Sequence, residues 1–509
     1  MKINRVLIIV VFAAASLFRL VDALRPIDRS SWRESDVGSI SRNFVREGMN
    51  PFYPRIDWRG TGPGYAEMEF PLYPWLIAVT YKLFGFHDVL GRLWSFAFSI
   101  GALYLFLKLA RESLSEYASI AAFAFFAVNP LILDASTALK PEGLLILSYI
   151  GAVYFFLRWY RSEKASDFAF AIVMTTLALL SKATATHIGI FFGVLLFQKF
   201  GKAVFYNWRV WLFGLATVLP AAAWYIHAKL LWINYGNSLG VSNEYHWVGP
   251  DFITNPYFIK GILGTEAADV WLVFGIAVAI FALSSGIRVL IAQRSLIWLA
   301  SAFVMYIVAA RTTADDWASY YHIFSVPPAA LLFGFGLERL GVETRKWADN
   351  FSRFSLSGTL ARLALGGLVV VAALATFGIA AERARAEFRS DRRPASSFDF
   401  GASLKPVLKR AGLILVSGSS CYDEDGYPVA YNSSFMFYAL DRKGSNICVE
   451  DQSPERIISF SDAGYQYFIA QRMEIAKKPG LDAWLNANYP LLAKNDEYEV
   501  FDLAATEGP

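Results

Sequence analysis

Charged residues are scarce in this 509-residue sequence. Asp, Glu, Lys and Arg make up 18%, whereas hydrophobic residues make up 55% and aromatic residues 16%. The mean hydropathy is +0.38. These values lie outside the range of ordinary soluble domains, so the composition predicts a polytopic membrane protein.

Several motif classes are absent as well. The sequence has no internal repeat, no low-complexity tract, no glycine-rich phosphate loop and no Cys/His pattern with metal-ligand spacing. The net charge of +4 is small. Basic residues on cytoplasmic loops of a membrane protein account for it, so we expect no nucleic acid partner.

Cysteine is nearly absent, and both cysteines, Cys421 and Cys448, lie in the polar C-terminal region. If that region is outside the cytosol, the two thiols can form a disulfide. Two buried free thiols are the alternative.

Long apolar runs dominate the rest of the chain. About eleven of them reach the roughly twenty residues that cross a bilayer. They lie near 4–24, 92–110, 114–134, 142–159, 166–181, 184–200, 208–229, 267–287, 294–311, 319–338 and 362–381. The first follows Lys2 and Arg5 as a secretory signal would, but no clear cleavage site follows it, so we interpret it as an anchor.

The basic residues predict the orientation. A cytoplasmic N-terminus places the Lys- and Arg-rich loops near 158–164, 199–209 and 339–362 in the cytoplasm. The arginines near 383–393 disagree, although charges that lead into a long translocated domain weigh less in this rule. We therefore expect an integral membrane protein with a cytoplasmic N-terminus and an extracytoplasmic C-terminal domain. An even number of spans stays open.

The C-terminal region, residues 386–509, is polar and follows a transmembrane domain at residues 1–385. Short β-like runs at 413–417, 435–440, 465–470 and 498–503 alternate with turn-rich segments. The predicted fold is therefore a polytopic all-α membrane protein with a small C-terminal α/β domain.

The connection between the first two apolar runs, residues 25–91, is long enough to be functional. It contains Arg33-Glu34-Ser35-Asp36 and later Glu67-Met68-Glu69. The apolar stretch 70–85 is too short for a comfortable crossing, so we interpret it as an interfacial helix.

Polar residues gather at the predicted external ends of the helices. Ionisable groups at such positions are functional candidates. They are Glu34, Asp36, Glu67, Glu69, Lys140, Glu142, Lys182, His187, Arg311, Asp315, Asp316, Tyr320, Tyr321 and His322.

Residues 1–340 resemble the GT-C superfamily of polyprenyl-phosphate-sugar transferases, in particular the branch of dolichyl-phosphate-mannose protein mannosyltransferases and lipid A aminoarabinose transferases. The stretches that carry the resemblance are Arg33-Glu34-Ser35-Asp36, Glu69-Phe70-Pro71-Leu72-Tyr73, Leu83-Phe84-Gly85 and Arg92-Leu93. The family commonly has an adjacent Asp-Glu pair, whereas Ser35 separates Glu34 from Asp36 here. The choice between these two carboxylates therefore stays open, and we favour Asp36.

The resemblance implies an inverting glycosyltransferase that takes a monosaccharide from a polyprenyl-phosphate donor. The acceptor classes are a cell-envelope glycan, a lipid or a protein. A positioned carboxylate can deprotonate the acceptor hydroxyl, and cations can stabilise the departing phosphate. We predict Asp36, Glu34 and Glu69 as catalytic; Lys182, Arg311 and His322 as phosphate-binding; and Tyr320, Tyr321, Lys140 and Glu142 as substrate-binding. Asp36 and Glu69 would hold Mg²⁺ or Mn²⁺ if a metal takes part.

Each assignment has a structural alternative. Asp36 could pair with Arg33 or Arg42, Glu69 could cap the interfacial helix, and Glu142 could simply start a helix after Pro141. Lys182 could reach the lipid headgroups, and the aromatic residues near 320 could form an interfacial belt. At the level of function, the alternatives are a transporter or lipid flippase and a non-catalytic scaffold, although no inverted repeat supports transport.

Overall fold

The computed structural model describes residues 2–25, 32–241, 256–314, 316–350, 355–389, 396–422, 426, 429 and 431–504. The chain forms two compact units. The transmembrane unit comprises Met1–Leu24, Leu93–Ala223 and His246–Ser390. The loop unit comprises Arg25–Arg92, Trp224–Tyr245 and Asp391–Pro509.

Within the described residues, eight helices are long and apolar enough to cross a membrane, or up to ten if each of two bent pairs counts as one span. The single spans are Val6–Ala23, Asp88–Ser113, Glu142–Ser162, Ala183–Tyr206, Trp208–Tyr235, Leu290–Val308, Ala318–Asp349 and Ser357–Ala386. A shorter apolar helix, α8 (Ala165–Ser181), accompanies them. Each predicted span falls on one of these helices or bent pairs, and the protein is an integral membrane protein.

The first bent pair joins α5 (Glu116–Val128) and α6 (Pro130–Thr137) at an angle of 58°. Pro130 cannot donate a backbone hydrogen bond and forces Asn129 into an extended conformation, which ends α5. The Asn129 side chain then accepts a bond from Leu131 N at 3.1 Å and caps α6. The predicted span at 114–134 is therefore broken rather than straight.

The second bent pair joins Pro256–Val270 to α13 (Gly275–Gly286) at an angle of 94°. Leu272 and Val273 have positive φ angles of 51° and 59°, which no helix can continue through. The prediction of one continuous helix over 267–287 is therefore wrong. Gly275 follows the break directly and is the first residue of α13, but neither Leu272 nor Val273 is a residue type that favours a positive φ angle.

Close helix packing holds the transmembrane unit together. The helix α16 (Val326–Asp349) packs against α5 and α13, and α7 (Glu142–Ser162) packs against α8. A Cβ atom on Gly334 of α16 would lie 2.5 Å from the carbonyl oxygen of Ala118 on α5. Only glycine permits this approach, because any side chain would separate the two helices.

The C-terminal part of the loop unit is a five-stranded mixed sheet with the strand order β4-β3-β5-β7-β6. The strands are β3 (Ile414–Ser417), β4 (Gly444–Ile447), β5 (Tyr467–Gln471), β6 (Leu491–Lys494) and β7 (Tyr498–Asp502). β3 runs parallel to β4 and β5, whereas β7 is antiparallel to β5 and β6.

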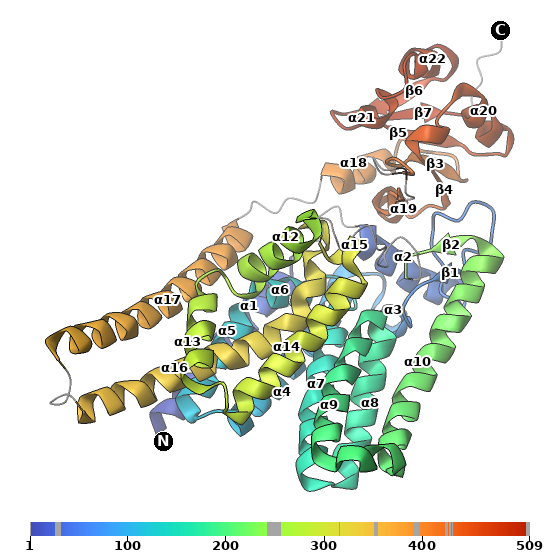
Figure 1. The fold of residues 1–509 in the computed structure, drawn as a ribbon. Coiled ribbons are helices and arrows are strands. Elements are labelled where there is room, and N and C mark those ends of the chain that lie inside the picture. The colour runs from blue at the N-terminus through green and yellow to red at the C-terminus, as the bar shows by residue number, and fades with distance from the viewer. Residues whose placement is uncertain are drawn as a thin grey trace. The chain divides into compact units, whose positions relative to one another are not determined.

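Helices cover both faces of this sheet (Figure 1). Leu415, Phe468 and Phe501 pack with residues of α20 (Pro454–Asp462) and α22 (Leu481–Asn488). The alternate strand residues, such as Val416 and Val500, pack with α18 (Ser396–Leu404) and α19 (Ser434–Leu440). This alternation is the period of two that a sheet buried on both faces requires. A small α/β domain is therefore confirmed.

Three of the four predicted strands coincide with β3, β5 and β7, but the fourth, at 435–440, is the helix α19. Its sequence, Phe435-Met436-Phe437-Tyr438-Ala439-Leu440, is a continuous apolar run without alternation. Periodicity cannot separate a short buried helix from a buried strand in such a run. β4 and β6 were not predicted because their residues are mostly polar or half-exposed.

Residues 32–87 of the first loop fold into two helices and a short strand. The helix α2 (Trp32–Glu47) carries the acidic motif, and α3 (Leu72–Phe84) coincides with the predicted interfacial helix. Between them, β1 (Ala66–Glu67) pairs with β2 (Asn237–Ser238). A small core that includes Ile40, Phe44, Met68 and Ala78 joins α2 to α3.

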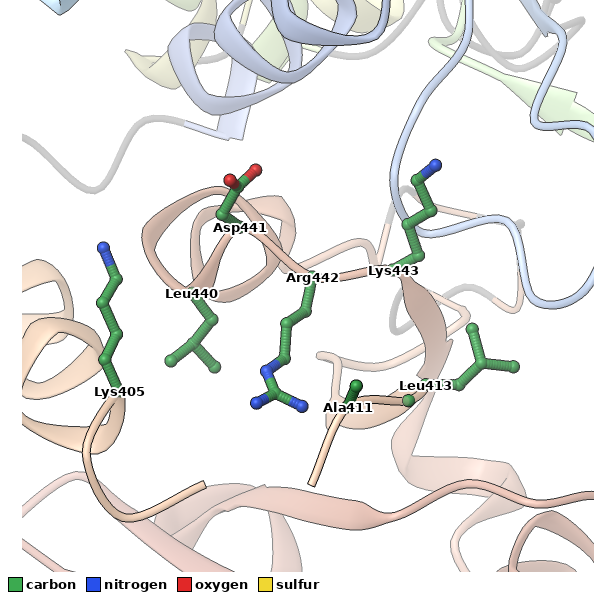
Figure 2. Close-up of a pocket in the computed structure, with 8 residues that line it drawn as sticks. Lys405, Ala411, Leu413, Leu440, Asp441, Arg442 and Lys443 are labelled. Atoms are coloured by element: carbon green, nitrogen blue, oxygen red, sulfur yellow. The ribbon is translucent and has the colours of Figure 1, made fainter. Parts of the chain in front are cut away.

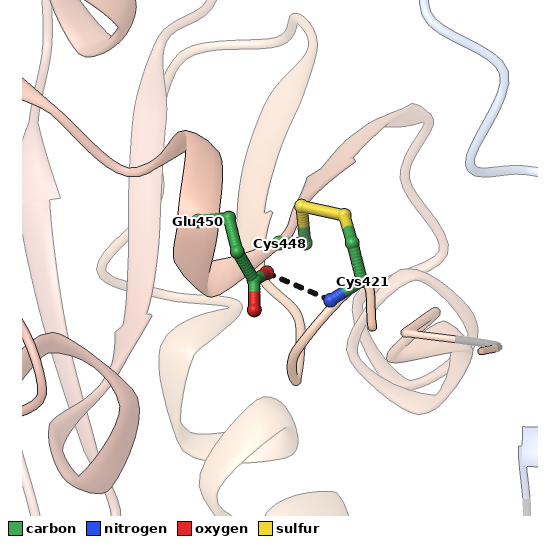
Figure 3. A group of neighbouring side chains, drawn as sticks. All are labelled: Cys421, Cys448 and Glu450. Atoms are coloured by element: carbon green, nitrogen blue, oxygen red, sulfur yellow. Dashed lines mark hydrogen bonds between the residues drawn. A yellow bond between two sulfur atoms is a disulfide. The ribbon is translucent and has the colours of Figure 1, made fainter. Parts of the chain in front are cut away.

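The two cysteines are joined in a disulfide, with a Cα–Cα distance of 5.5 Å between Cys421 and Cys448 (Figure 3). The bridge links the segment after β3 to the residue that follows β4. Of the two alternatives that the sequence left open, the structure therefore contains the bonded form.

Candidate active site

Asp36 lies on the second turn of α2, with none of its surface exposed. The indole N–H of Trp58 donates a hydrogen bond of 2.8 Å to Asp36 Oδ1. Asp36 Oδ2 is buried and has no hydrogen-bond partner among the residues that the structure describes. The hydroxyl of Ser434 lies beside it but donates its proton to the carbonyl oxygen of Trp32 at 2.7 Å.

Burial raises the pKa of the Asp36 carboxyl from its ordinary value of 3.8 to about 7. The hydrogen bond from Trp58 and the charge of Arg33 lower the pKa only partly, and the charge of Asp57 raises it further. The carboxyl is therefore poised to take up or release a proton near neutral pH. A buried acid with a perturbed pKa and an unoccupied oxygen is a functional candidate.

The other acidic residues of the first loop have closer partners. Arg33 donates to both carboxylate oxygens of Glu69, at 2.9 and 3.0 Å. Pro71 occupies the N-cap position of α3 without a side-chain cap, so Glu69 orients Arg33 rather than capping the helix. Glu67 binds the hydroxyl of Ser238. Glu34 is buried on the first turn of α2.

The structural alternative for Asp36 is not observed. Arg33 pairs with Glu69, and Arg42 lies against the ring of Tyr438 at 3.8 Å and near Asp441 at 3.6 Å. Neither arginine forms an ion pair with Asp36 in the described structure.

A second cluster of predicted residues lies within the transmembrane unit. Lys182 directly follows α8, and its ammonium group lies 3.1 Å from Glu142 Oε1. The same ammonium group lies 4.2 and 4.4 Å from the ring centroids of Tyr320 and Tyr321, which stack on each other. Glu142 is also the first residue of α7. The alternative that it simply starts a helix is therefore compatible with the ion pair to Lys182. The structure thus brings three predicted residues together around a fourth, the cation Lys182.

The remaining predicted residues lie elsewhere. His322 is fully buried, with Nδ1 2.8 Å from Glu266 Oε1 and Nε2 2.9 Å from the carbonyl oxygen of Thr313. Neither ring nitrogen is left for a phosphate while these bonds persist. Lys140 is half-exposed, and its carbonyl accepts from Ser95. The side chains of Arg311 and Asp316, and all of Asp315, lie outside the described residues.

The described carboxylates of the first loop do not form a metal-binding group. The group with suitably close ligand atoms in the described part of the chain is Cys421, Cys448 and Glu450. Both of its sulfur atoms are used in the disulfide, and Glu450 accepts a 2.7 Å bond from Cys421 N (Figure 3). The predicted pair of Asp36 and Glu69 does not fit a metal well, because Arg33 occupies both oxygens of Glu69.

A pocket of about 680 Å³ lies in the C-terminal domain beside the end of α19 (Figure 2). Figure 2 shows Arg442 pointing away from the side on which Asp441 and Lys443 lie. The guanidinium group of Arg442 donates to the carbonyl oxygens of Leu408 and Arg410, both at 2.6 Å. Lys443 binds Glu47. These basic groups therefore already have structural partners.

Sequence reasoning missed two residues beside Asp36, Trp58 and Ser434, and a third, Tyr438, that packs against Gly38 on the same helix. Trp58 stands in Asp57-Trp58-Arg59-Gly60, which follows the acidic motif, but nothing in that run identifies the indole as a partner of Asp36. Ser434 and Tyr438 lie in the misassigned run 435–440 or next to it. A correct helix assignment there would have placed these two residues on one face, because they are four positions apart.

Comparisons with known proteins agree with this architecture. Residues 68–226 match the family model of dolichyl-phosphate-mannose-protein mannosyltransferase. No curated protein matches the sequence.

Solved structures match over nearly the whole chain. ArnT from Cupriavidus metallidurans, bound to undecaprenyl phosphate, has a TM-score of 0.66 and 14% identity over 98% of this chain and 99% of that chain. Archaeal oligosaccharyltransferase AglB from Archaeoglobus fulgidus, in complex with an inhibitory peptide and a dolichol-phosphate, has a TM-score of 0.55 and 12% identity over 94% and 71%. Arabinofuranosyltransferase AftD from Mycobacteria has a TM-score of 0.58 and 12% identity over 98% and 40%. The chain therefore has the GT-C fold, and the predicted resemblance to this superfamily is confirmed.

Proposed function

We propose that this protein is a membrane glycosyltransferase that moves a monosaccharide from a polyprenyl-phosphate donor to an acceptor hydroxyl, with Asp36 as the general base. The observation that carries the proposal is the buried Asp36 carboxyl, which has one unoccupied oxygen and a pKa of about 7. It stands in the first loop of a GT-C fold.

The chemistry requires such a group. The acceptor oxygen forms a bond to the anomeric carbon while the bond from that carbon to the donor phosphate breaks, and the acceptor proton passes to Asp36 Oδ2. A base with a pKa near the working pH is the most effective proton acceptor. Attack from the side opposite the phosphate inverts the anomeric centre.

The departing polyprenyl phosphate gains negative charge, which a preorganised cation stabilises. We assign this role to Lys182, since Glu142, Tyr320 and Tyr321 hold its ammonium group in place. A fixed ammonium group loses little freedom when a phosphate arrives. Arg311 remains a prediction for phosphate binding, and Lys140 remains a prediction for substrate binding.

Glu69 and Glu34 take supporting roles. The Arg33–Glu69 pair lies next to Asp36 in the loop unit, and the charge of Arg33 favours the ionised form of Asp36. Loss of Glu69 would free Arg33 to pair with Asp36 directly, which would weaken the base. Glu34 remains the alternative base.

The lipids named for the solved relatives support the donor class. ArnT was solved with undecaprenyl phosphate, and AglB was solved with a dolichol-phosphate. We propose a polyprenyl-phosphate monosaccharide as donor, an envelope glycan, lipid or protein as acceptor, and the bacterial inner membrane as location. The first loop and the C-terminal domain would face the extracytoplasmic side. No catalytic step in this proposal passes through a metal.

The test is transfer by the purified protein in detergent or nanodiscs with a panel of undecaprenyl-phosphate sugars, measured as release of undecaprenyl phosphate. We expect release with the parent protein and none with Asp36→Asn. A transporter or flippase would move labelled donor across a vesicle bilayer without cleaving it. A scaffold would do neither, and its function in cells would survive Asp36→Asn.

A further inference from the structure

The helix α19 of the C-terminal domain has two occupied faces. Met436, Phe437 and Leu440 pack into the core beneath the sheet. Ser434 and Tyr438, one helical turn apart, face α2 of the first loop. A single short helix thus joins the core of the sheet to the helix that carries Asp36.

The contacts between these helices run along the whole of α2. At its start, Ser434 Oγ donates to the carbonyl oxygen of Trp32 at 2.7 Å. In the middle, Arg42 donates to the carbonyl oxygen of Tyr438 at 2.9 Å and stacks on its ring at 3.8 Å. Toward its end, Arg46 donates to both carboxylate oxygens of Asp441 at 2.7 Å.

Gly38 marks the closest approach. A Cβ atom at this position would lie 2.4 Å from Cε2 of Tyr438, so only glycine admits the ring. Glycine within a helix is unfavourable by about 1 kcal/mol relative to alanine. Its presence here, two residues after Asp36, is explained by the Tyr438 ring. The hydroxyl of Tyr438 in turn binds Asp88.

We propose that α19 is a positioning element of the active site: Ser434 and Tyr438 set the rotation and depth of α2 and thereby hold Asp36 in its buried place. This inference rests on the proposed role of Asp36 as base. Tyr438 acts through Asp36 and needs no contact with substrate.

The contact between α19 and α2 should affect the pKa of Asp36, which can be measured from the pH–rate profile. The groups that face its carboxyl are Arg33 on α2, Asp57 and Trp58 from the following segment, and Ser434 on α19. Burial raises the pKa of Asp36 more than any other cause. A displaced α2 would admit water, lower this pKa and shift the acidic limb of the pH–rate profile to lower pH.

The experiment compares Tyr438→Ala, Tyr438→Phe and Gly38→Ala in the full-length protein, with kcat, KM for the donor and the pH profile as readouts. Tyr438→Ala and Gly38→Ala should lower kcat by about a hundredfold, the typical effect of a 1 Å misplacement, with KM for the donor little changed. Both should move the acidic limb to lower pH. Tyr438→Phe keeps the ring against Gly38 and should keep most of the activity.

Tyr489→Ala is the matched control, because Tyr489 is a buried tyrosine that packs with Trp484 in the other core cluster of the domain. It should lower the melting temperature but leave kcat and the pH profile unchanged. Parent-like kcat and acidic limb in Tyr438→Ala overturn the positioning role. If that variant does not fold, Ser434→Ala and Gly38→Ala decide, and unchanged pH profiles in both overturn it.

The two proposals fail in different ways. Full activity of Asp36→Asn overturns the base itself, whatever the tyrosine variants do. Loss of activity in Asp36→Asn, together with parent-like Tyr438→Ala, retains the base and rejects the positioning helix.

Discussion

The two ends of α2 hold carboxyl groups in opposite electrostatic settings. Near the start, Asp36 accepts one hydrogen bond from a neutral indole, and burial raises its pKa to about 7. At the end, burial alone would raise the pKa of Glu47, but hydrogen bonds from Arg59 and Lys443 outweigh it and lower the pKa. Arg55 adds a third cation at 3.4 Å. An acid that binds several cations directly stays ionised and ties segments together, whereas Asp36, whose nearby cation Arg33 pairs with Glu69, can exchange a proton.

The largest expected effect is the loss of transfer when Asp36, near the start of α2, is replaced. Asp36→Asn keeps an oxygen for Trp58 but cannot take up a proton, so transfer should fall by at least about a hundredfold. Glu34→Gln should reduce transfer less. Turnover of a defined donor at matched amounts of inserted protein measures both. If Glu34→Gln abolishes turnover and Asp36→Asn retains it, the general base is Glu34.

Two lysines of the transmembrane unit allow a second comparison, between a cation assigned to the donor and one that is not. Lys182 and Lys199 each lie beside a glutamate and aromatic rings. Lys182→Ala removes the cation assigned to the departing phosphate and should lower kcat/KM for the donor by about tenfold, the equivalent of one lost charge-assisted bond. Lys199 lies 2.7 Å from Glu163 and near Tyr160, so Lys199→Ala is the matched control. Equal donor kinetics in the two variants would remove Lys182 from the site.

The other end of α2 should affect stability rather than chemistry. Glu47→Gln leaves Arg59, whose side chain is only 6% exposed, without its charged partner. We expect a loss of about 1–3 kcal/mol in unfolding free energy with turnover per folded molecule retained. Thermal unfolding of purified protein measures this, with exposed Glu455→Gln as the control. A turnover loss as large as that of Asp36→Asn would contradict the division of roles.

The last prediction concerns the pH dependence of stability. The Asp36 pKa is raised on folding, so between about pH 4 and 7 the folded protein keeps a proton that the unfolded chain has lost, and stability falls as pH rises through this window. Asp36→Asn carries no such proton. It should therefore melt above the parent near pH 8, and the difference should vanish near pH 4. A constant difference across this range would show that Asp36 is not strained by burial.

Much of the fold was predictable because membrane spans are a one-dimensional signal of length and hydropathy. The break at Pro130 also has a local cause. The break at Leu272 and Val273 has a weaker local signal, since only Gly275 marks it and the two residues with positive φ angles are apolar. The strand predicted at 435–440 is wrong because the apolar residues of this run fit a helix or a strand equally well.

The site was predictable only in part. The carboxylates of the first loop stand in a recognisable order. Lys182 and its three partners were predicted because they lie at the ends of predicted helices. The surroundings of Asp36 did not follow, since Ser434 lies 402 residues after the carbonyl that it binds. Contacts between residues so far apart in the sequence cannot be predicted from the local sequence pattern. His322 was predicted from its place near a helix end, and both of its ring nitrogens have buried hydrogen-bond partners, which the local sequence does not indicate.

Asn129 bears on how the chain is inserted into the membrane. Its side-chain amide donates to the carbonyl oxygens of Asp269 and Val270, at 3.0 and 3.1 Å, and thereby joins the break after α5 to the second broken helix pair. Carbonyl groups at such a break need donors, because lipid supplies none. These acceptors are synthesised 140 residues after Asn129. These two hydrogen bonds can therefore form only after the second broken pair has been synthesised.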